Sequence, residues 1–260
     1  MSERTEGFEP KHEPFRYSQL GGIIETLFDS RGQAILLPRR QLESGSYRGG
    51  SHVCLPNFGP DATGQLKQHG FGRDVSWKLV SRKGNSVYLA MDADENLIPG
   101  LYHGLSATQH FNYVEDEHSG GGVFSTQLGV KNNSDHAMRL DPGFHPYLYL
   151  PEGYAELEGQ TVDPISFAGT EFIHKPSSVD GKPNPVVLIT RTHKIEVWGV
   201  NLERYAIWSM GDTGEEAYLC IEPTFAGARF AESTSPQADE LLLPGPVCTY
   251  DYNIRWTPLD

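Results

Sequence analysis

Three short segments of the chain each contain a side chain that can exchange a proton. They are Gln68-His69-Gly70-Phe71-Gly72-Arg73, Phe144-His145-Pro146-Tyr147 and Cys220-Ile221-Glu222-Pro223. Histidine titrates near neutral pH, and a glutamate that ends an apolar strand is partly desolvated, which raises its pKa toward neutrality. Together, His69, His145 and Glu222 could remove one proton and donate another, which is general acid–base catalysis.

Two arginines lie in glycine-containing segments that suit ligand binding. Arg48 precedes Gly49 and Gly50, and glycines permit a ligand to approach the backbone closely. Arg73 follows Gly72, and its guanidinium could hold a carboxylate in place or bind a substrate anion. On local sequence alone, the alternative is structural: an arginine in a surface turn, a satisfied histidine, or a solvated glutamate at a strand end.

The order Arg-Gly-Gly, His-Gly-Phe-x-Arg, His-Pro-Tyr and Glu-Pro resembles the galactose mutarotase-like superfamily. Within it, the chain is most similar to the aldose 1-epimerases and the glucose-6-phosphate 1-epimerases (hexose-6-phosphate mutarotases). The resemblance extends from about Gly21 to about Arg255. It implies a large single-domain antiparallel β-sandwich that interconverts the α and β anomers of a hexose or hexose 6-phosphate without a metal or organic cofactor.

The resemblance also implies a role for individual residues. Glu222 matches the general base, and His145 matches the general acid that protonates the ring oxygen. His69 matches a residue that hydrogen-bonds the region of the sugar ring. Arg48 and Arg73 match residues that line the sugar or phosphate pocket.

Two positions depart from the family pattern. The family has an aspartate after the His-Pro-Tyr motif that contacts sugar hydroxyls, and here only Asp163 and Glu171 are candidates for it. The tryptophan-asparagine pair that is usual near the pocket is Trp208-Ser209 in this chain. We expect Trp208 to contact the substrate.

Composition excludes several classes of protein. The 260 residues carry a formal net charge of −13, which argues against a nucleic-acid partner but not against a small anionic substrate. The three cysteines, Cys54, Cys220 and Cys248, cannot all pair, and the apolar runs around two of them predict reduced thiols. Residues 1–17 are polar and lack an apolar signal-peptide core, and no apolar run approaches the roughly 20 residues of a membrane span. We therefore expect a cytoplasmic protein without a membrane partner.

Short β-branched and aromatic runs separated by Gly, Pro, Asn and Asp predict many strands and few helices. We expect a flexible tail over 1–17 and one β-sandwich domain over 18–260. The best helical candidate is 107–117. The predicted strands are 23–28, 34–37, 86–92, 123–130, 186–190, 194–200, 204–210, 217–222 and 247–256.

Motifs for other chemistries are absent from the sequence. Gly120-Gly121-Gly122 is not a dinucleotide fingerprint, and there is no phosphate-binding Gly-Lys-Ser/Thr loop and no Gly-x-Ser-x-Gly elbow. The ten histidines lack metal-ligand spacing. An all-β hydrolase would need two facing carboxylates, and only one is evident. The main alternative to a mutarotase is a non-catalytic protein of the same fold that binds or senses sugars.

Overall fold

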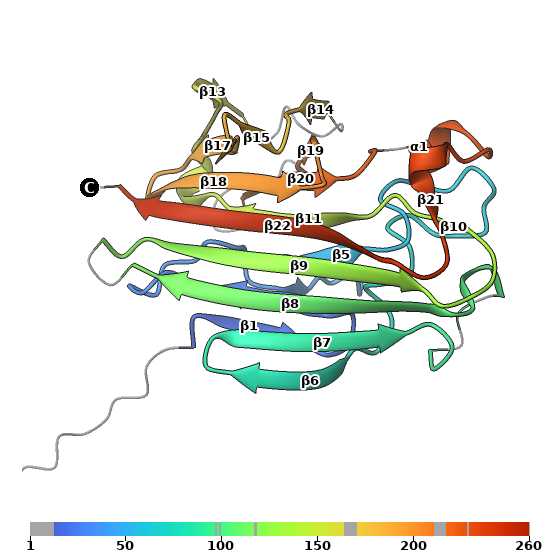
Figure 1. The fold of residues 1–260 in the computed structure, drawn as a ribbon. Helices are drawn as coiled ribbons and strands as arrows, with labels where there is room; N and C mark the ends of the chain where they lie inside the picture. Colours follow the sequence, from blue (N-terminus) through green and yellow to red (C-terminus); the bar gives the residue numbers. More distant parts are fainter. Residues whose placement is uncertain are drawn as a thin grey trace, which may run out of the picture.

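The computed structural model describes residues 13–96, 98, 100–116, 119–163, 171–210, 217–227 and 229–259. Two large sheets are packed face to face (Figure 1). All neighbouring strands that the structure describes in these sheets are antiparallel. The fold is therefore the predicted all-β sandwich.

The seven-stranded sheet carries the residues of interest at its centre. Its strands, in spatial order, are β1 (Phe15–Ser18), β2 (Ile23–Leu27), β5 (Ser51–Cys54), β11 (Gly143–Tyr149), β20 (Tyr218–Thr224), β19 (Arg204–Trp208) and β14 (Glu171–His174).

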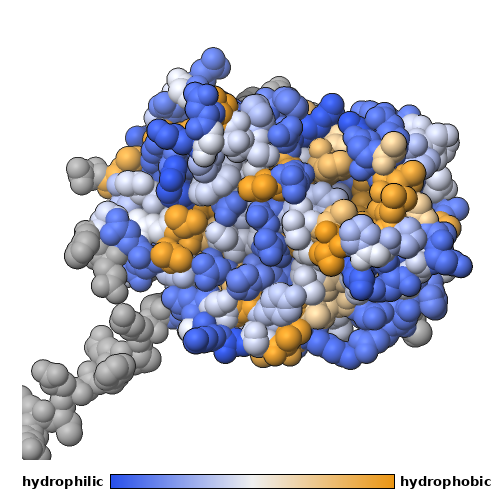
Figure 2. Space-filling model, in the orientation of Figure 1, coloured by the Kyte–Doolittle hydropathy of each residue, from blue (hydrophilic) through white to orange (hydrophobic). Residues whose placement is uncertain are grey.

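The nine-stranded sheet forms the second layer, and its outer face is turned to the viewer in Figure 1. Its strands, in spatial order, are β13 (Gln160–Val162), β12 (Ala155–Leu157), β17 (Val186–Ile189), β18 (His193–Val200), β22 (Val247–Pro258), β9 (Gly122–Asn132), β8 (Leu105–Glu115), β7 (Ser86–Asp92) and β6 (Lys78–Lys83). The surface seen in this view is mostly hydrophilic, with scattered apolar residues (Figure 2).

Three two-stranded ladders and four short helices complete the described structure. The ladders are β3 (Arg40–Gln41) with β4 (Tyr47–Arg48), β10 (Met138–Arg139) with β21 (Leu241–Leu242), and β15 (Ser178–Val179) with β16 (Lys182–Pro183). The helices are α1 (Arg229–Glu232) and the 3-10 turns η1 (Gly100–Tyr102), η2 (Pro151–Gly153) and η5 (Ala238–Glu240).

One hydrophobic core fills the space between the two sheets. In β7, burial alternates along the strand, so Val87, Leu89 and Met91 point inward. In β11, Phe144 and Leu148 belong to the same core. His145 and Tyr147 of β11 therefore point to the opposite face of the seven-stranded sheet, away from the nine-stranded sheet.

Most predicted strands agree with the structure to within two residues at each end, and 86–92 coincides with β7. The strand predicted at 34–37 is wrong, because this segment contributes only the isolated bridges of Ala34 and Leu36. Strands β5 and β11, which carry part of the candidate site, were not predicted at all.

The helix predicted at 107–117 is also wrong. Residues 107–115 belong to β8, and Glu117 lies outside the described residues. Burial alternates from Leu105 to Tyr113, and β8 pairs along its whole length with β7 on one side and β9 on the other. The backbone hydrogen bonds of two neighbouring strands outweigh a weak local preference for helix.

The N-terminal boundary differs from the predicted one. Phe15, Arg16 and Tyr17, which we placed in the tail, form β1 together with Ser18 and pair with β2. Phe15 is buried in the main core, so the sheet begins before residue 18. Residues 1–12 lie outside the described residues, and the division into a tail and one domain otherwise stays a prediction.

Candidate active site

A row of side chains crosses the seven-stranded sheet on the face that points away from the core. Tyr147 pairs with Cys220 between β11 and β20, so two residues further along the antiparallel register His145 lies opposite Glu222. On the other side of β11, His145 pairs directly with His52 of β5. Because directly opposed side chains on one sheet face lie about 5 Å apart, strand register alone brings these groups together.

The acid and base predicted from the sequence are in direct contact. His145 Nε2 lies 3.3 Å from Glu222 Oε1. Only about one-twentieth of each side chain is exposed to solvent, 6% for His145 and 4% for Glu222. The imidazole of His145 is also stacked between the rings of His52 and Tyr147, with centroid separations of 4.9 and 4.7 Å.

His69 approaches this row from a loop rather than from a strand. Its ring packs edge-on against that of His145 at 5.1 Å, and its Nδ1 lies 3.4 Å from Cys54 Sγ. His69 has a φ of 67°, a left-handed conformation that is uncommon for residues other than glycine. Gly70 follows with a φ of 63°, and a Cβ there would lie 2.1 Å from the Leu55 carbonyl oxygen. Glycine is therefore required for the turn that presents His69.

The two predicted arginines flank the same row. Arg73 Nη1 lies 3.2 Å from His52 Nε2, and Arg73 Nη2 donates to the Gln68 carbonyl at 3.3 Å. The guanidinium carbon of Arg48 lies 5.9 Å from the centroid of the Trp208 ring. Among the residues that the structure describes, neither arginine forms an ion pair with a carboxylate.

All six residues proposed from the sequence line a single pocket of about 350 Å³. A cavity of this size is at the lower end of small-molecule sites. The lining consists of Arg48, Phe58, Gln68, His69, Arg73, His145, Tyr147, Trp208 and Glu222.

Burial dominates the electrostatics of this pocket. It raises the pKa of Glu222 well above its ordinary range, an effect partly opposed by a hydrogen bond from Cys220. It lowers the pKa of His145 well below the ordinary value, and the nearby His52, His69 and Arg73 lower it further. Burial and then Arg73 lower the pKa of His69 to about 4. These histidines therefore favour the neutral form at neutral pH, as acceptors and donors of hydrogen bonds.

Sequence reasoning missed His52, a titratable residue beside the pocket, as well as the lining residues Phe58, Gln68 and Tyr147. His52 is 8% exposed, and burial followed by Arg73 lowers its pKa well below the ordinary value. Arginine can only donate, so His52 Nε2 accepts from Arg73 and the imidazole is neutral. The alternation of Ser51-His52-Val53-Cys54, with Val53 in the core, was the signal that could have placed His52 on the pocket face.

Three further candidates from the sequence do not belong to the pocket. Lys67, considered as an additional cation, forms an ion pair with Asp74 at 2.5 Å and is absent from the pocket lining. Asp163 does not line the pocket either. Glu171 lies in the outermost strand β14, and its side chain lies outside the described residues. The carboxylate that replaces the family aspartate therefore stays unassigned.

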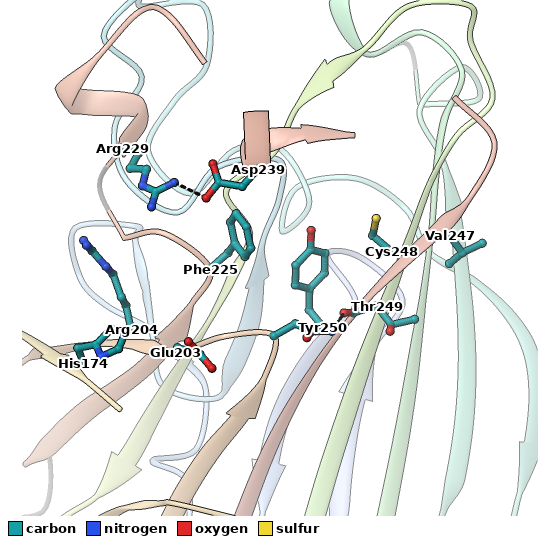
Figure 3. Close-up of a pocket in the computed structure, with 11 residues that line it drawn as sticks. His174, Glu203, Arg204, Phe225, Arg229, Asp239, Val247, Cys248, Thr249 and Tyr250 are labelled. Atoms are coloured by element: carbon teal, nitrogen blue, oxygen red, sulfur yellow. Dashed lines mark hydrogen bonds and ion pairs between the residues drawn. The ribbon is translucent and has the colours of Figure 1, made fainter. Parts of the chain in front are cut away.

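A larger cavity of about 720 Å³ lies elsewhere, beside α1 and the start of β22 (Figure 3). In it, the guanidinium of Arg229 is paired with Asp239 at 2.8 Å. Arg204 donates to the Ala226 carbonyl at 3.2 Å, and the ring of Tyr250 packs edge-on against that of Phe225. The cavity is larger than the pocket described above, but among its described lining residues no histidine contacts a carboxylate.

The cysteines and helices bear on two further expectations. All three cysteines are free; Cys54 and Cys220 are buried, and Cys248 is half-buried. Within the described part of the chain, none of the helices combines the length and the apolar character needed to cross a membrane.

Comparisons with known proteins bear on the fold and on the family of the chain. The solved structures that resemble the chain include the galactose mutarotase related enzyme from Lactobacillus acidophilus, at a TM-score of 0.70 and 17% identity, with 95% of this chain and 94% of that chain covered. The Slr1438 protein from Synechocystis sp. PCC 6803 has a TM-score of 0.67 and 20% identity, with coverage of 93% and 90%. The galactose 1-epimerase from Lactobacillus acidophilus NCFM has a TM-score of 0.64 and 12% identity, with coverage of 95% and 91%.

At these identities, the similarity of structure shows the fold. No curated protein matches the sequence. The family model of aldose 1-epimerase matches residues 42–171, which is half of the 260-residue chain and includes Arg48, His69, Arg73 and His145. The chain belongs to the aldose 1-epimerase family.

Proposed function

We propose that this protein is a mutarotase that interconverts the α and β anomers of a hexose 6-phosphate by general acid–base catalysis. The observation that carries the proposal is the contact of 3.3 Å between His145 Nε2 and Glu222 Oε1 inside the pocket. The family supports an epimerase acting on a sugar. The residue roles and the phosphate on the substrate are our own assignment.

Mutarotation requires proton transfer at two oxygens that are bonded to the same carbon. In the first step, the proton that the pair shares moves from Glu222 to His145. Glu222 then takes the proton of the C1 hydroxyl, the bond from C1 to the ring oxygen breaks, and His145 gives its proton to that oxygen. In the open-chain aldehyde, rotation about the bond between C1 and C2 then presents the other face of the carbonyl to the freed hydroxyl. In the second step, the freed hydroxyl attacks the other face of C1, returns its proton to His145, and Glu222 reprotonates O1. The adjacency of the two reacting oxygens explains why acid and base can lie side by side.

The proton count of the pair suits this cycle. Burial raises the pKa of Glu222 and lowers that of His145, so one proton is held between the two groups. Whichever partner holds this proton, the pair contains one acid and one base. In the ionised arrangement Glu222 is the base and His145 the acid. His69, whose ring packs against that of His145, is placed to orient the sugar ring.

The arginines support a phosphorylated substrate. A protein with a net charge of −13 repels a sugar phosphate at long range, so binding requires a local group of cations. Arg48 and Arg73 line the pocket, and with Arg39 they also line an adjoining hollow of about 290 Å³. Arg39 is partly neutralised by Glu25 at 3.3 Å. Arg48 and Arg73 have no such partner among the described residues and can bind the phosphate.

Anomer exchange measured by NMR tests the catalytic assignment. Glucose, galactose and their 6-phosphates are compared with the wild-type protein, Glu222→Gln, and Glu203→Gln as a control carboxylate that lines the larger cavity. Glu222→Gln should lose about 10²–10⁴ of the catalysed exchange, because the amide cannot accept a proton. It should still bind sugar within about tenfold of wild type, since the shape is kept. A wild-type protein that binds sugar without catalysing exchange would show a binding or sensing protein instead.

A second variant tests the charge of the substrate. Arg48→Ala should weaken glucose 6-phosphate by about 10–100-fold relative to glucose, the value of one charge-assisted hydrogen bond, and added salt should reduce the difference. Arg82→Ala, at the exposed edge strand β6, is the control. An equal loss for both sugars would show that Arg48 is structural. Equal use of both sugars by the wild-type protein would contradict the phosphorylated substrate without affecting the acid–base assignment.

A further inference from the structure

Cys220 shares a strand face with the proposed base. It precedes Glu222 by two residues in β20, so both side chains point away from the main core. His145 lies opposite Glu222 on the neighbouring strand. A nitrogen of His145, the sulfur of Cys220 and a carboxylate oxygen of Glu222 all lie within 4.8 Å of one another, and all three residues are buried.

The spacing of these atoms suits a tetrahedral metal ion. Bonds of about 2.0–2.1 Å to a histidine nitrogen and about 2.0–2.2 Å to a carboxylate oxygen, at a tetrahedral angle, place the two ligand atoms about 3.3–3.5 Å apart. The observed distance between His145 Nε2 and Glu222 Oε1 is 3.3 Å. The distance between these two atoms therefore already suits coordination, and the Cys220 sulfur lies within 4.8 Å of both residues' ligand atoms.

The chemistry of the three ligands selects the kind of ion. A thiolate with an imidazole and one carboxylate favours Zn²⁺ and its spectroscopic substitute Co²⁺, whereas Mg²⁺ and Ca²⁺ prefer oxygen ligands. Thiolate and carboxylate together neutralise a divalent cation. The complex would therefore avoid most of the free-energy cost of burying a net charge.

Access and coordination number also fit. His145 and Glu222 line the pocket, so an ion can reach them from solvent, and a fourth ligand could come from the pocket. Burial and the charge of Glu222 raise the pKa of the Cys220 thiol, so the metal must displace the thiol proton to solvent when it binds.

We propose that His145, Cys220 and Glu222 form a binding site for a thiophilic divalent metal ion, Zn²⁺ or Co²⁺, which reversibly inhibits the protein. The bound ion occupies the lone pairs through which His145 and Glu222 exchange protons with a sugar. Metal binding stands on the geometry alone, whereas inhibition rests on the proposed mutarotase function. The metal is an inhibitor here, not a cofactor.

Cobalt titration of the metal-free protein tests the site directly. One equivalent of Co²⁺ should produce visible bands of tetrahedral cobalt and a near-ultraviolet band from thiolate-to-cobalt charge transfer. Cys220→Ser should lose the charge-transfer band. The double variant Cys54→Ser, Cys248→Ser, in which Cys220 is the remaining thiol, should keep it. The double variant also tests whether Cys54 could be the thiolate ligand instead, because the Cys54 sulfur lies 3.4 Å from Nδ1 of the pocket residue His69.

The outcomes separate this proposal from the proposed function. No stoichiometric binding by the wild-type protein, or a band that survives in Cys220→Ser and disappears in the double variant, would overturn the metal site. In anomer exchange, Zn²⁺ should inhibit the wild type, EDTA should restore it, and Cys220→Ser should require roughly tenfold or more Zn²⁺ for the same inhibition. Stoichiometric cobalt binding by a protein without exchange activity would sustain the metal site and refute the mutarotase.

Discussion

Replacing Asp141 by asparagine should change how the stability of the protein depends on pH. Asp141 is fully buried and ties two segments of the pocket together. Its Oδ1 accepts a hydrogen bond from the Ala226 amide at 2.8 Å, just after β20, and its own amide donates to the Pro56 carbonyl at 2.8 Å, just before Phe58. Its second carboxylate oxygen has no hydrogen-bond partner in the part of the chain that the structure describes.

The sign and size of the effect follow from the pKa of this carboxyl group. Burial raises it from 3.8 to about 7, although the hydrogen bond from Ala226 lowers it and nearby Glu240 raises it. Between these two values the folded protein holds a proton that the unfolded chain has released. Stability is therefore lost as pH rises from about 4 to about 7, by up to about 1.4 kcal/mol per pH unit and about 4 kcal/mol in total. Asparagine cannot ionise and still offers an oxygen to Ala226.

Urea denaturation at half-unit steps from pH 4 to pH 8 measures the effect. The free energy of unfolding of Asp141→Asn, minus that of the wild type, should increase with pH across this window and level off above about pH 7. Asp239→Asn is the control without a slope, because a hydrogen bond from Arg229 lowers the pKa of Asp239 and its titration therefore lies below this pH window. A difference for Asp141→Asn that is constant with pH, or that falls as pH rises, would refute the reasoning.

Three further predictions concern the pocket. His52→Leu should raise KM for hexose 6-phosphate by about tenfold with little change in kcat, because Arg73 loses a hydrogen-bond acceptor. His52→Gln should recover most of the lost affinity. A similar rise in KM for unphosphorylated glucose would contradict this role of Arg73. Gly70→Ala should destabilise the protein by about 1–3 kcal/mol in urea denaturation, since φ at this residue is 63° and the new Cβ meets the Leu55 carbonyl oxygen. A variant as stable as the wild type would show that the turn does not require glycine. Exhaustive chelation should not lower anomer exchange, and activity that returns only with added metal would disprove the cofactor-free mechanism.

The sequence by itself indicated the candidate acid–base residues and determined much of the sheet. Proton-exchanging residues at His69, His145 and Glu222 could be named from their neighbours, and the β-branched runs that became β7, β9 and β22 were placed to within two residues. These features depend on local composition and period, which a single sequence contains. The helix predicted at 107–117 shows the limit of such reasoning, because the pairing partners of β8 are distant in sequence.

Only the tertiary structure decided which groups meet. His145 faces Glu222 on one side and His52 on the other because β11 lies between β5 and β20 in a particular register. A shift of one residue would have sent these side chains into the opposite face of the sheet. The contact of Arg73 with His52 and the pairing of Lys67 with Asp74 likewise depend on where loops dock. Strand register and loop docking are set by packing over the whole sandwich, and no local pattern in the chain encodes them.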